Sequence, residues 1–167
     1  MQSLIVKLII IAAALWEEAA KYLAARTIFR REREFDELTD GMIYLIVVAL
    51  GFAASENIII VLGSLLEDPT QNIFLLLGLR TIGANLLHTF SSGILGYFLA
   101  RGIFLGERFS LLKGLLGASA IHALFNWFVL QSSNREPLYT VLVIMVLLGG
   151  LIIILNDFHN LKRYDKR

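Results

Sequence analysis

The chain has 167 residues, of which 57% are hydrophobic, and its mean hydropathy is +0.71. A water-soluble domain of this length cannot bury so much apolar surface, so the composition excludes an ordinary soluble enzyme. The formal net charge is +1 and no long basic tract occurs, which argues against nucleic acid as a partner. Cysteine is absent, which excludes a disulfide framework, a thiol nucleophile and thiolate metal ligands.

Five apolar runs of about 20 residues follow one another, each long enough to cross roughly 30 Å of hydrocarbon. All should be helical, because a helix is the open-ended structure that satisfies every backbone hydrogen bond in lipid. The expected fold class is all-α, a polytopic membrane helical bundle of about five transmembrane helices that forms a single domain over 1–167. The runs cover 4–28, 42–66, 72–100, 110–130 and 138–155.

The first run also carries a feature of signal peptides, the small residues Ala12, Ala13 and Ala14. Lys7 interrupts the apolar core that such a signal needs, and the helical pattern continues beyond the alanines through Tyr22. We therefore expect the first span to be retained. The charged stretch 29–40 that follows it is expected to be an exposed helical extension or an ordered loop.

Basic residues alternate between the connections and predict an orientation. They follow the first span (Arg26, Arg30, Arg31, Arg33), the third span (Arg101, Arg108) and the fifth span (Lys162, Arg163, Lys166, Arg167). The loops after the second and fourth spans hold Arg135 between them. By the positive-inside rule the N-terminus lies outside and the C-terminus in the cytoplasm, with the lipid bilayer as solvent.

Polar side chains interrupt four of these spans. An ionisable group costs about 2.5–3.5 kcal/mol to insert at the bilayer centre, so these groups must face one another or water. Glu17, Glu56, His88 and His122 all fall near the middle of their spans, which predicts one interior site. The candidates are Glu17, Glu18 and Lys21 in the first span, Glu56 and Asn57 in the second, Arg80 and His88 in the third, and His122 and Asn126 in the fourth.

Helical spacing supports this convergence. Glu17 and Glu18 precede Lys21 by four and three residues, so both carboxylates can reach its ammonium group. His122 and Asn126 are four apart and share one stripe of their helix. Taken alone, a Glu-Lys pair often reaches toward the membrane interface, and a membrane histidine often bonds two helices together. Four helices with such groups at one depth favour a functional site.

Four motifs on successive spans together resemble those of PrsW-type proteases. They are Glu17-Glu18-Ala-Ala-Lys21, Phe52-Ala-Ala-Ser-Glu56-Asn57, Arg80 through His88 to Gly93, and His122-Ala-Leu-Phe-Asn126. That family is related to the CAAX prenyl-protein endopeptidases and bacteriocin-processing enzymes, and more remotely to the Aph scaffold subunit of gamma-secretase. The resemblance implies a multi-pass intramembrane endopeptidase of a prokaryotic cell membrane that acts on membrane-anchored proteins. An anti-sigma factor is the best-known kind of substrate.

The resemblance also implies a catalytic role for each of these residues. The related prenyl-protein enzymes are thought to activate water with a glutamate. Glu17 or Glu18 would be the general base, and we favour Glu17, with Glu18 as its electrostatic partner. His88 would position the water or carry the proton, and His122 and Asn126 would donate hydrogen bonds to the oxyanion. Supporting roles would fall to Lys21, Glu56, Asn57 and Arg80.

A metal mechanism and two other functions stay open. His88, His122, Glu17 and Glu56 could form a two-histidine, two-carboxylate zinc shell. The lack of an HExxH pairing, and a lysine beside the carboxylates, favour a hydrolase without metal or other cofactor. A catalytically silent scaffold or chaperone of the same superfamily is the alternative function. A proton-coupled transporter is a third, although the chain lacks repeated halves and broken helices.

Overall fold

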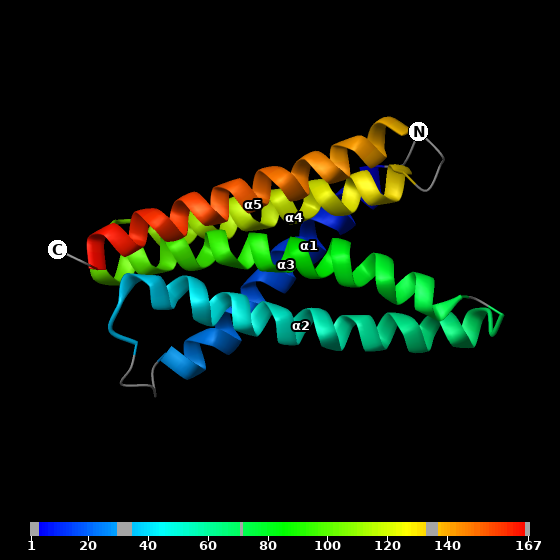
Figure 1. Cartoon of the computed structure of the whole chain (residues 1–167), viewed down its shortest axis with the longest axis horizontal. Helices are drawn as coiled ribbons and strands as arrows, with labels where there is room; N and C mark the ends of the chain where they lie inside the picture. The colour runs from blue at the N-terminus through cyan, green and yellow to red at the C-terminus, as the bar shows by residue number, and fades with distance from the viewer. Residues whose placement is uncertain (1–3, 30–34, 71, 133–136, 166–167) are drawn as a thin grey trace.

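The computed structural model describes residues 4–29, 35–70, 72–132 and 137–165, and its long segments are all helices (Figure 1). The helices are α1 (Leu4–Phe29), α2 (Leu38–Glu67), α3 (Ile73–Phe104), α4 (Ser110–Ser132) and α5 (Pro137–Asp165). No strand occurs among these described residues. The prediction of an all-α bundle of five helices is confirmed.

Four of the helices, α2 to α5, are long and apolar enough to cross a membrane. α1 has 26 residues and, at 1.5 Å per residue, a comparable length of about 39 Å, but its charged side chains set it apart. The chain is therefore a multi-pass membrane protein. Which end faces the cytoplasm, and whether α1 spans fully, stay predictions.

Local signals set the helix boundaries. The backbone N–H of Glu37 donates to the carboxylate of Asp40 at 2.8 Å, which fixes the start of α2. The side chain of Asn72 accepts from the backbone N–H of Leu75 at 3.1 Å and caps α3. α5 begins at Pro137, a residue whose missing N–H is harmless in a first turn.

All five helices are longer than their apolar runs, and α2 and α5 exceed them by the most. α2 begins at Leu38 rather than 42, so part of the charged stretch 29–40 is helical, while 30–34 lies outside the described residues. α5 continues to Asp165 rather than ending at 155. Its last turns stay helical because Leu161 is fully buried, in a core cluster that also contains Met42.

α3 lies at the centre of the bundle and packs against α2, α4 and α5, and more lightly against α1. Its closest neighbour is α2, at Gly41 and Gly96. A Cβ on Gly41 would lie 2.8 Å from the Gly96 carbonyl oxygen, and one on Gly96 would lie 2.7 Å from the Met42 Cα. The two backbones touch because neither position carries a side chain, as is common between membrane helices.

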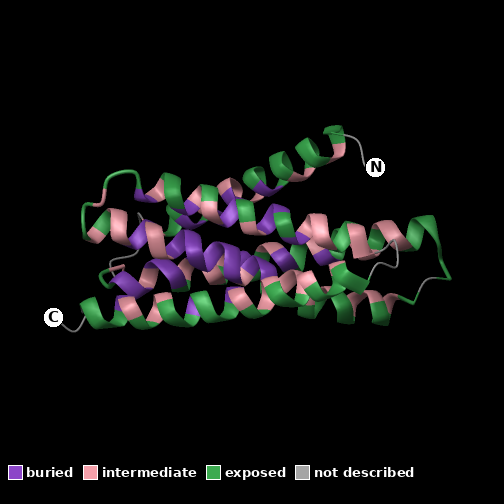
Figure 2. Cartoon of the chain, turned by 90° about the horizontal axis from the view of Figure 1, so that it is seen from above, coloured by how far each residue is buried: buried purple, intermediate pink, exposed green. Residues whose placement is uncertain are grey.

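α1 crosses the bundle obliquely behind α3 (Figure 1). Its first turns diverge from the other helices and are exposed, whereas burial is concentrated in the middle of the bundle and toward the C-terminal end (Figure 2). One stripe of α1 is buried, and its members are Ala14, Glu18, Lys21 and Ala25. The stripe thus carries two charged residues into the interior.

Candidate active site

Glu18 is the centre of a buried polar cluster. Its side chain is fully buried, and its Oε1 accepts hydrogen bonds from Lys21 Nζ at 2.7 Å and from Ser91 Oγ at 2.8 Å. His122 Nδ1 lies 2.9 Å from the same oxygen, and Ser92 Oγ donates to Oε2 at 3.1 Å. Three of these contacts share Oε1 and one is made to Oε2, from three different helices. Glu18 is therefore held in one position.

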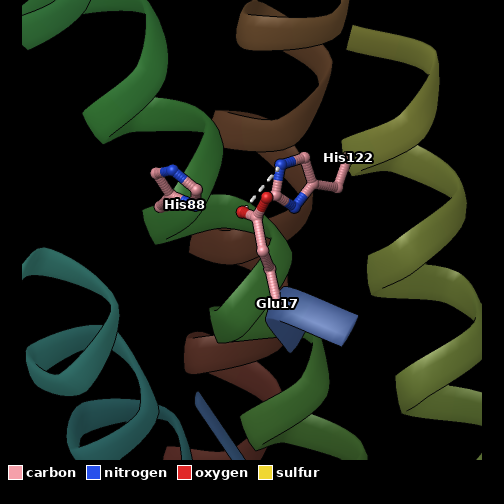
Figure 3. A group of neighbouring side chains, drawn as sticks. All are labelled: Glu17, His88 and His122. Atoms are coloured by element: carbon pink, nitrogen blue, oxygen red, sulfur yellow. Dashed lines mark ion pairs between the residues drawn. The ribbon is translucent and has the colours of Figure 1, made fainter. Parts of the chain in front are cut away.

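Glu17 is placed differently, although it is the adjacent residue. It rises from α1 between His88 and His122, as Figure 3 shows, and its Oε2 lies 3.5 Å from His122 Nε2. That oxygen is buried and has no hydrogen-bond partner among the residues that the structure describes. A buried polar atom without a partner is uncommon and is a frequent mark of a catalytic or binding position.

The two histidines are oriented by different neighbours. A carboxylate accepts only, so His122 donates its Nδ1–H to Glu18 and turns Nε2 toward Glu17. An ammonium donates only, so His88 Nδ1 accepts from Lys21 Nζ at 2.8 Å. Its Nε2 then carries the proton and donates to Glu56 Oε2 at 3.1 Å. Contacts from two helices, α1 and α2, thus fix both ring orientations.

A second polar network extends the cluster along α2 and α3. Arg80 donates through Nη2 to Glu56 Oε2 at 2.9 Å and through Nε to Asn57 Oδ1 at 2.7 Å. Asn57 in turn donates to Asn85 Oδ1 at 3.0 Å. The ion pair of Arg80 with Glu56 therefore joins Arg80 to His88 through Glu56.

A cavity of about 370 Å³ opens onto this cluster. Glu56, Arg80, His88, His122 and Asn126 supply its polar lining. Apolar side chains from α3, α4 and α5 form the remainder. The site therefore has both an enclosed polar face and an apolar wall suited to a hydrophobic substrate.

The structure brings the predicted residues together with one difference. Glu17, Glu18, Lys21, Glu56, His88 and His122 form one cluster, with Asn57, Arg80 and Asn126 beside it. The sequence suggested that both carboxylates could reach Lys21, but the ion pair is with Glu18, because Glu17 points to His122. Adjacent helical residues point about 100° apart, so one lysine on the buried stripe reaches one of them.

Ser91 and Ser92 were not among the predicted residues. They follow His88 by three and four residues, so all three side chains lie on one face of α3. That spacing was the available signal, but small hydroxyl residues also occur throughout membrane helices as packing residues.

The family model described as "PrsW family intramembrane metalloprotease" matches residues 2–151. The chain belongs to the PrsW family. All the candidate site residues lie inside the matched range.

Two curated relatives carry the name Protease PrsW. The protein from Clostridioides difficile (strain 630) is 27% identical over 143 residues, which cover 83% of this chain and 58% of the relative. The protein from Geobacillus kaustophilus (strain HTA426) is 28% identical over 126 residues, covering 74% of this chain and 52% of the relative. The chain thus spans somewhat more than half the length of these relatives. No solved structure matches it.

The word metalloprotease in the family description raises the question of a metal ion. Glu17, His88 and His122 each offer a ligand atom, and these atoms lie within 4.8 Å of one another. Glu17 and His122 fit a metal, since one oxygen of Glu17 is unpaired and the other nitrogen of His122 is held by a carboxylate, as in many metal sites.

His88 does not fit a metal in this arrangement. Lys21 Nζ occupies its Nδ1, and the resulting tautomer places a proton on Nε2, which donates to Glu56. A neutral imidazole needs a free nitrogen lone pair to bind a metal ion. The ammonium group also adds positive charge beside the place where a cation would sit. The residues as arranged hold two of the three donors that a catalytic metal requires.

Proposed function

We propose that the chain is an intramembrane endopeptidase that hydrolyses peptide bonds of membrane-anchored proteins with Glu17 as general base. The observation that carries this proposal is the buried, unpaired Oε2 of Glu17, 3.5 Å from His122 Nε2. A water molecule beside both atoms would satisfy the carboxylate and be ready to lose a proton to it. Helix association alone would pair this oxygen rather than leave it open, because an unpaired buried acceptor costs about 1–3 kcal/mol.

The chemistry needs one proton cycle. Glu17 removes a proton from the water, and the resulting hydroxide attacks the carbonyl carbon to form a tetrahedral oxyanion. The protonated Glu17 then returns the proton to the leaving amine as the C–N bond breaks. Asn126 lines the cavity that His88 and His122 also line, and in this mechanism it would donate to the oxyanion, an interaction commonly worth about 3–4 kcal/mol. His122 Nε2 faces Glu17 and stabilises the proton on its way.

The remaining residues act by positioning. Glu18 fixes the His122 ring, and Lys21 holds Glu18 and His88 at once. His88 therefore serves as a bridge between Lys21 and Glu56 rather than as a second water-binding base. Orienting groups of this kind typically contribute 10–100-fold to activity.

The proposal includes a mechanism that does not depend on a metal ion. It is supported by the Lys21 contact to His88, which leaves that histidine no free nitrogen. The same glutamate chemistry would place the family beside the CAAX prenyl-protein endopeptidases. The apolar wall of the cavity supports a membrane-anchored substrate, and an anti-sigma factor with a single span would be one member of that class.

The experiment is cleavage of a panel of single-span membrane proteins by the purified protein in liposomes. Cleavage that is lost in Glu17→Gln and retained after exhaustive chelation supports the whole proposal. No cleavage of any panel member contradicts the endopeptidase activity. Full cleavage by Glu17→Gln contradicts the general-base role of Glu17. Stoichiometric zinc by mass spectrometry, together with activity lost on chelation and restored by zinc, contradicts the metal-independent mechanism.

A further inference from the structure

A second cavity lies far from the candidate active site, where the C-terminal ends of α3 and α5 meet (Figure 1). Its volume is about 360 Å³, and none of the residues of the polar cluster lines it. The lining residues are Tyr97, Arg101, Asn160, Arg163 and Tyr164. Each of these side chains carries an N–H or O–H donor. A cavity walled by donors suits a ligand made mainly of acceptors.

Arg101 forms a fixed wall of this cavity. Its Nη1 donates to the Tyr97 hydroxyl oxygen at 3.0 Å, and its Nη2 pairs with Glu107. Its guanidinium lies 5.4 Å from the ring centre of Tyr97 and 6.0 Å from that of Tyr164. Because the Tyr97 oxygen accepts from Arg101, the hydroxyl proton of Tyr97 is free to donate into the cavity.

Arg163 supplies the positive charge that is not already used. Two acidic groups already interact with Arg101. Glu107 forms an ion pair with it, and Asp157 is attracted to its charge. Arg163 is exposed and forms no ion pair with the side chains that the structure describes in residues 4–29, 35–70, 72–132 and 137–164. An anion in the cavity would therefore meet one uncompensated guanidinium and several neutral donors.

The position of the cavity in the bundle favours a lipid headgroup over a free anion in solution. α3 and α5 are both candidate membrane spans, and the cavity lies within their last turns, so it sits at the depth of lipid headgroups. Basic pockets between membrane helices at the cytoplasmic side commonly bind anionic headgroups. The charge distribution predicts that this end is cytoplasmic. We propose that this cavity binds the phosphate headgroup of an anionic phospholipid.

Basic residues in a last helical turn have another use, since they stabilise the negative end of the helix dipole. Lys162 and Arg163 are both in the last turn of α5, but Arg163 lines the cavity and Lys162 does not. If both residues only stabilised the helix dipole, replacing either one would have the same effect, and the tyrosines and Asn160 would have no part in it. Lys162 is therefore a matched control for Arg163.

The experiment measures binding of phosphatidylglycerol to the delipidated full chain in detergent by native mass spectrometry, with phosphatidylcholine and inorganic phosphate as comparison probes. One basic residue near an anionic headgroup is worth roughly fivefold in affinity. We expect Arg163→Gln to weaken phosphatidylglycerol binding about fivefold, Tyr164→Phe to weaken it measurably and Lys162→Gln to change it less than twofold.

Three results would overturn the proposal. Equal losses in Arg163→Gln and Lys162→Gln would indicate diffuse attraction rather than a site. Equal binding of phosphatidylcholine would remove the requirement for an anionic headgroup. Displacement of the lipid by equimolar inorganic phosphate would assign the cavity to a free anion. All three readouts are independent of proteolysis, so they stand apart from the proposed function.

Discussion

Glu17 and Glu18 are adjacent, yet their surroundings predict opposite responses to the same substitution. In Glu18→Gln, the buried ammonium of Lys21 loses its counter-charge, and an amide NH₂ group faces donors. Removing one partner of a buried ion pair costs about 3–5 kcal/mol in soluble proteins, and single hydrogen bonds in membrane proteins are weaker. We therefore expect Glu18→Gln to lower the free energy of unfolding by about 3 kcal/mol. For a chain of this size that corresponds to a fall in Tm of about 6–12 °C.

Glu17→Gln should behave as the matched control for stability. It removes one contact of 3.5 Å and leaves the ion pair intact, so we expect a loss below about 1 kcal/mol and a Tm within about 4 °C of wild type. Peptide hydrolysis should nevertheless fall at least 100-fold in this variant, because the base is lost.

Both quantities are measurable on the same detergent-purified protein, by thermal unfolding followed through tryptophan fluorescence and by turnover of a cleaved single-span substrate. Equal Tm values for the two variants would refute the division of roles. So would a stable, inactive Glu18→Gln beside an unstable, active Glu17→Gln.

Three further outcomes follow from the packing and the charge distribution. Ser91→Ala should lower kcat about 10–100-fold with an unchanged KM, because it removes one of the donors that hold the Glu18 carboxylate against His122. An unchanged kcat would exclude Ser91 from the site. Gly96→Ala should lower the free energy of unfolding by about 1–3 kcal/mol in thermal melts. Gly51→Ala should be neutral or stabilising, because a Cβ there meets no atom of the described part of the chain within 4 Å. Equal losses in both variants would contradict the close-approach argument. Reporters fused after Pro69 and after Arg108 should read external and cytoplasmic, and a cytoplasmic signal at Pro69 would overturn the orientation.

The helices and the existence of a polar cluster were predictable, since both follow from the cost of placing polar groups in lipid. Glu56, His88 and His122 had to find partners, and they do. The extension of α5 to Asp165 was missed because hydropathy marks where lipid ends, whereas Leu161 continues the helix by packing on protein.

The choice of partners within the cluster was not predictable from spacing. Whether Lys21 meets Glu17 or Glu18 depends on the rotation of α1 against α3 and α4, which is a property of the assembled bundle. The donation by Ser91 and Ser92 likewise needs two helices at hydrogen-bonding distance. Local sequence reports which groups need a partner, and tertiary packing decides which partner each receives.

The contact between Gly41 and Gly96 also sets the register of α2 against α3. Glu56 lies 15 residues after Gly41, and Arg80 lies 16 residues before Gly96, so the ion pair of Glu56 with Arg80 follows from the same antiparallel alignment. Deleting one residue between Gly41 and Glu56 would turn Glu56 by about 100° and shift it by about 1.5 Å. Length variation among related chains should therefore be confined to the α2–α3 turn, while the two helical stretches on either side of it keep a constant residue count.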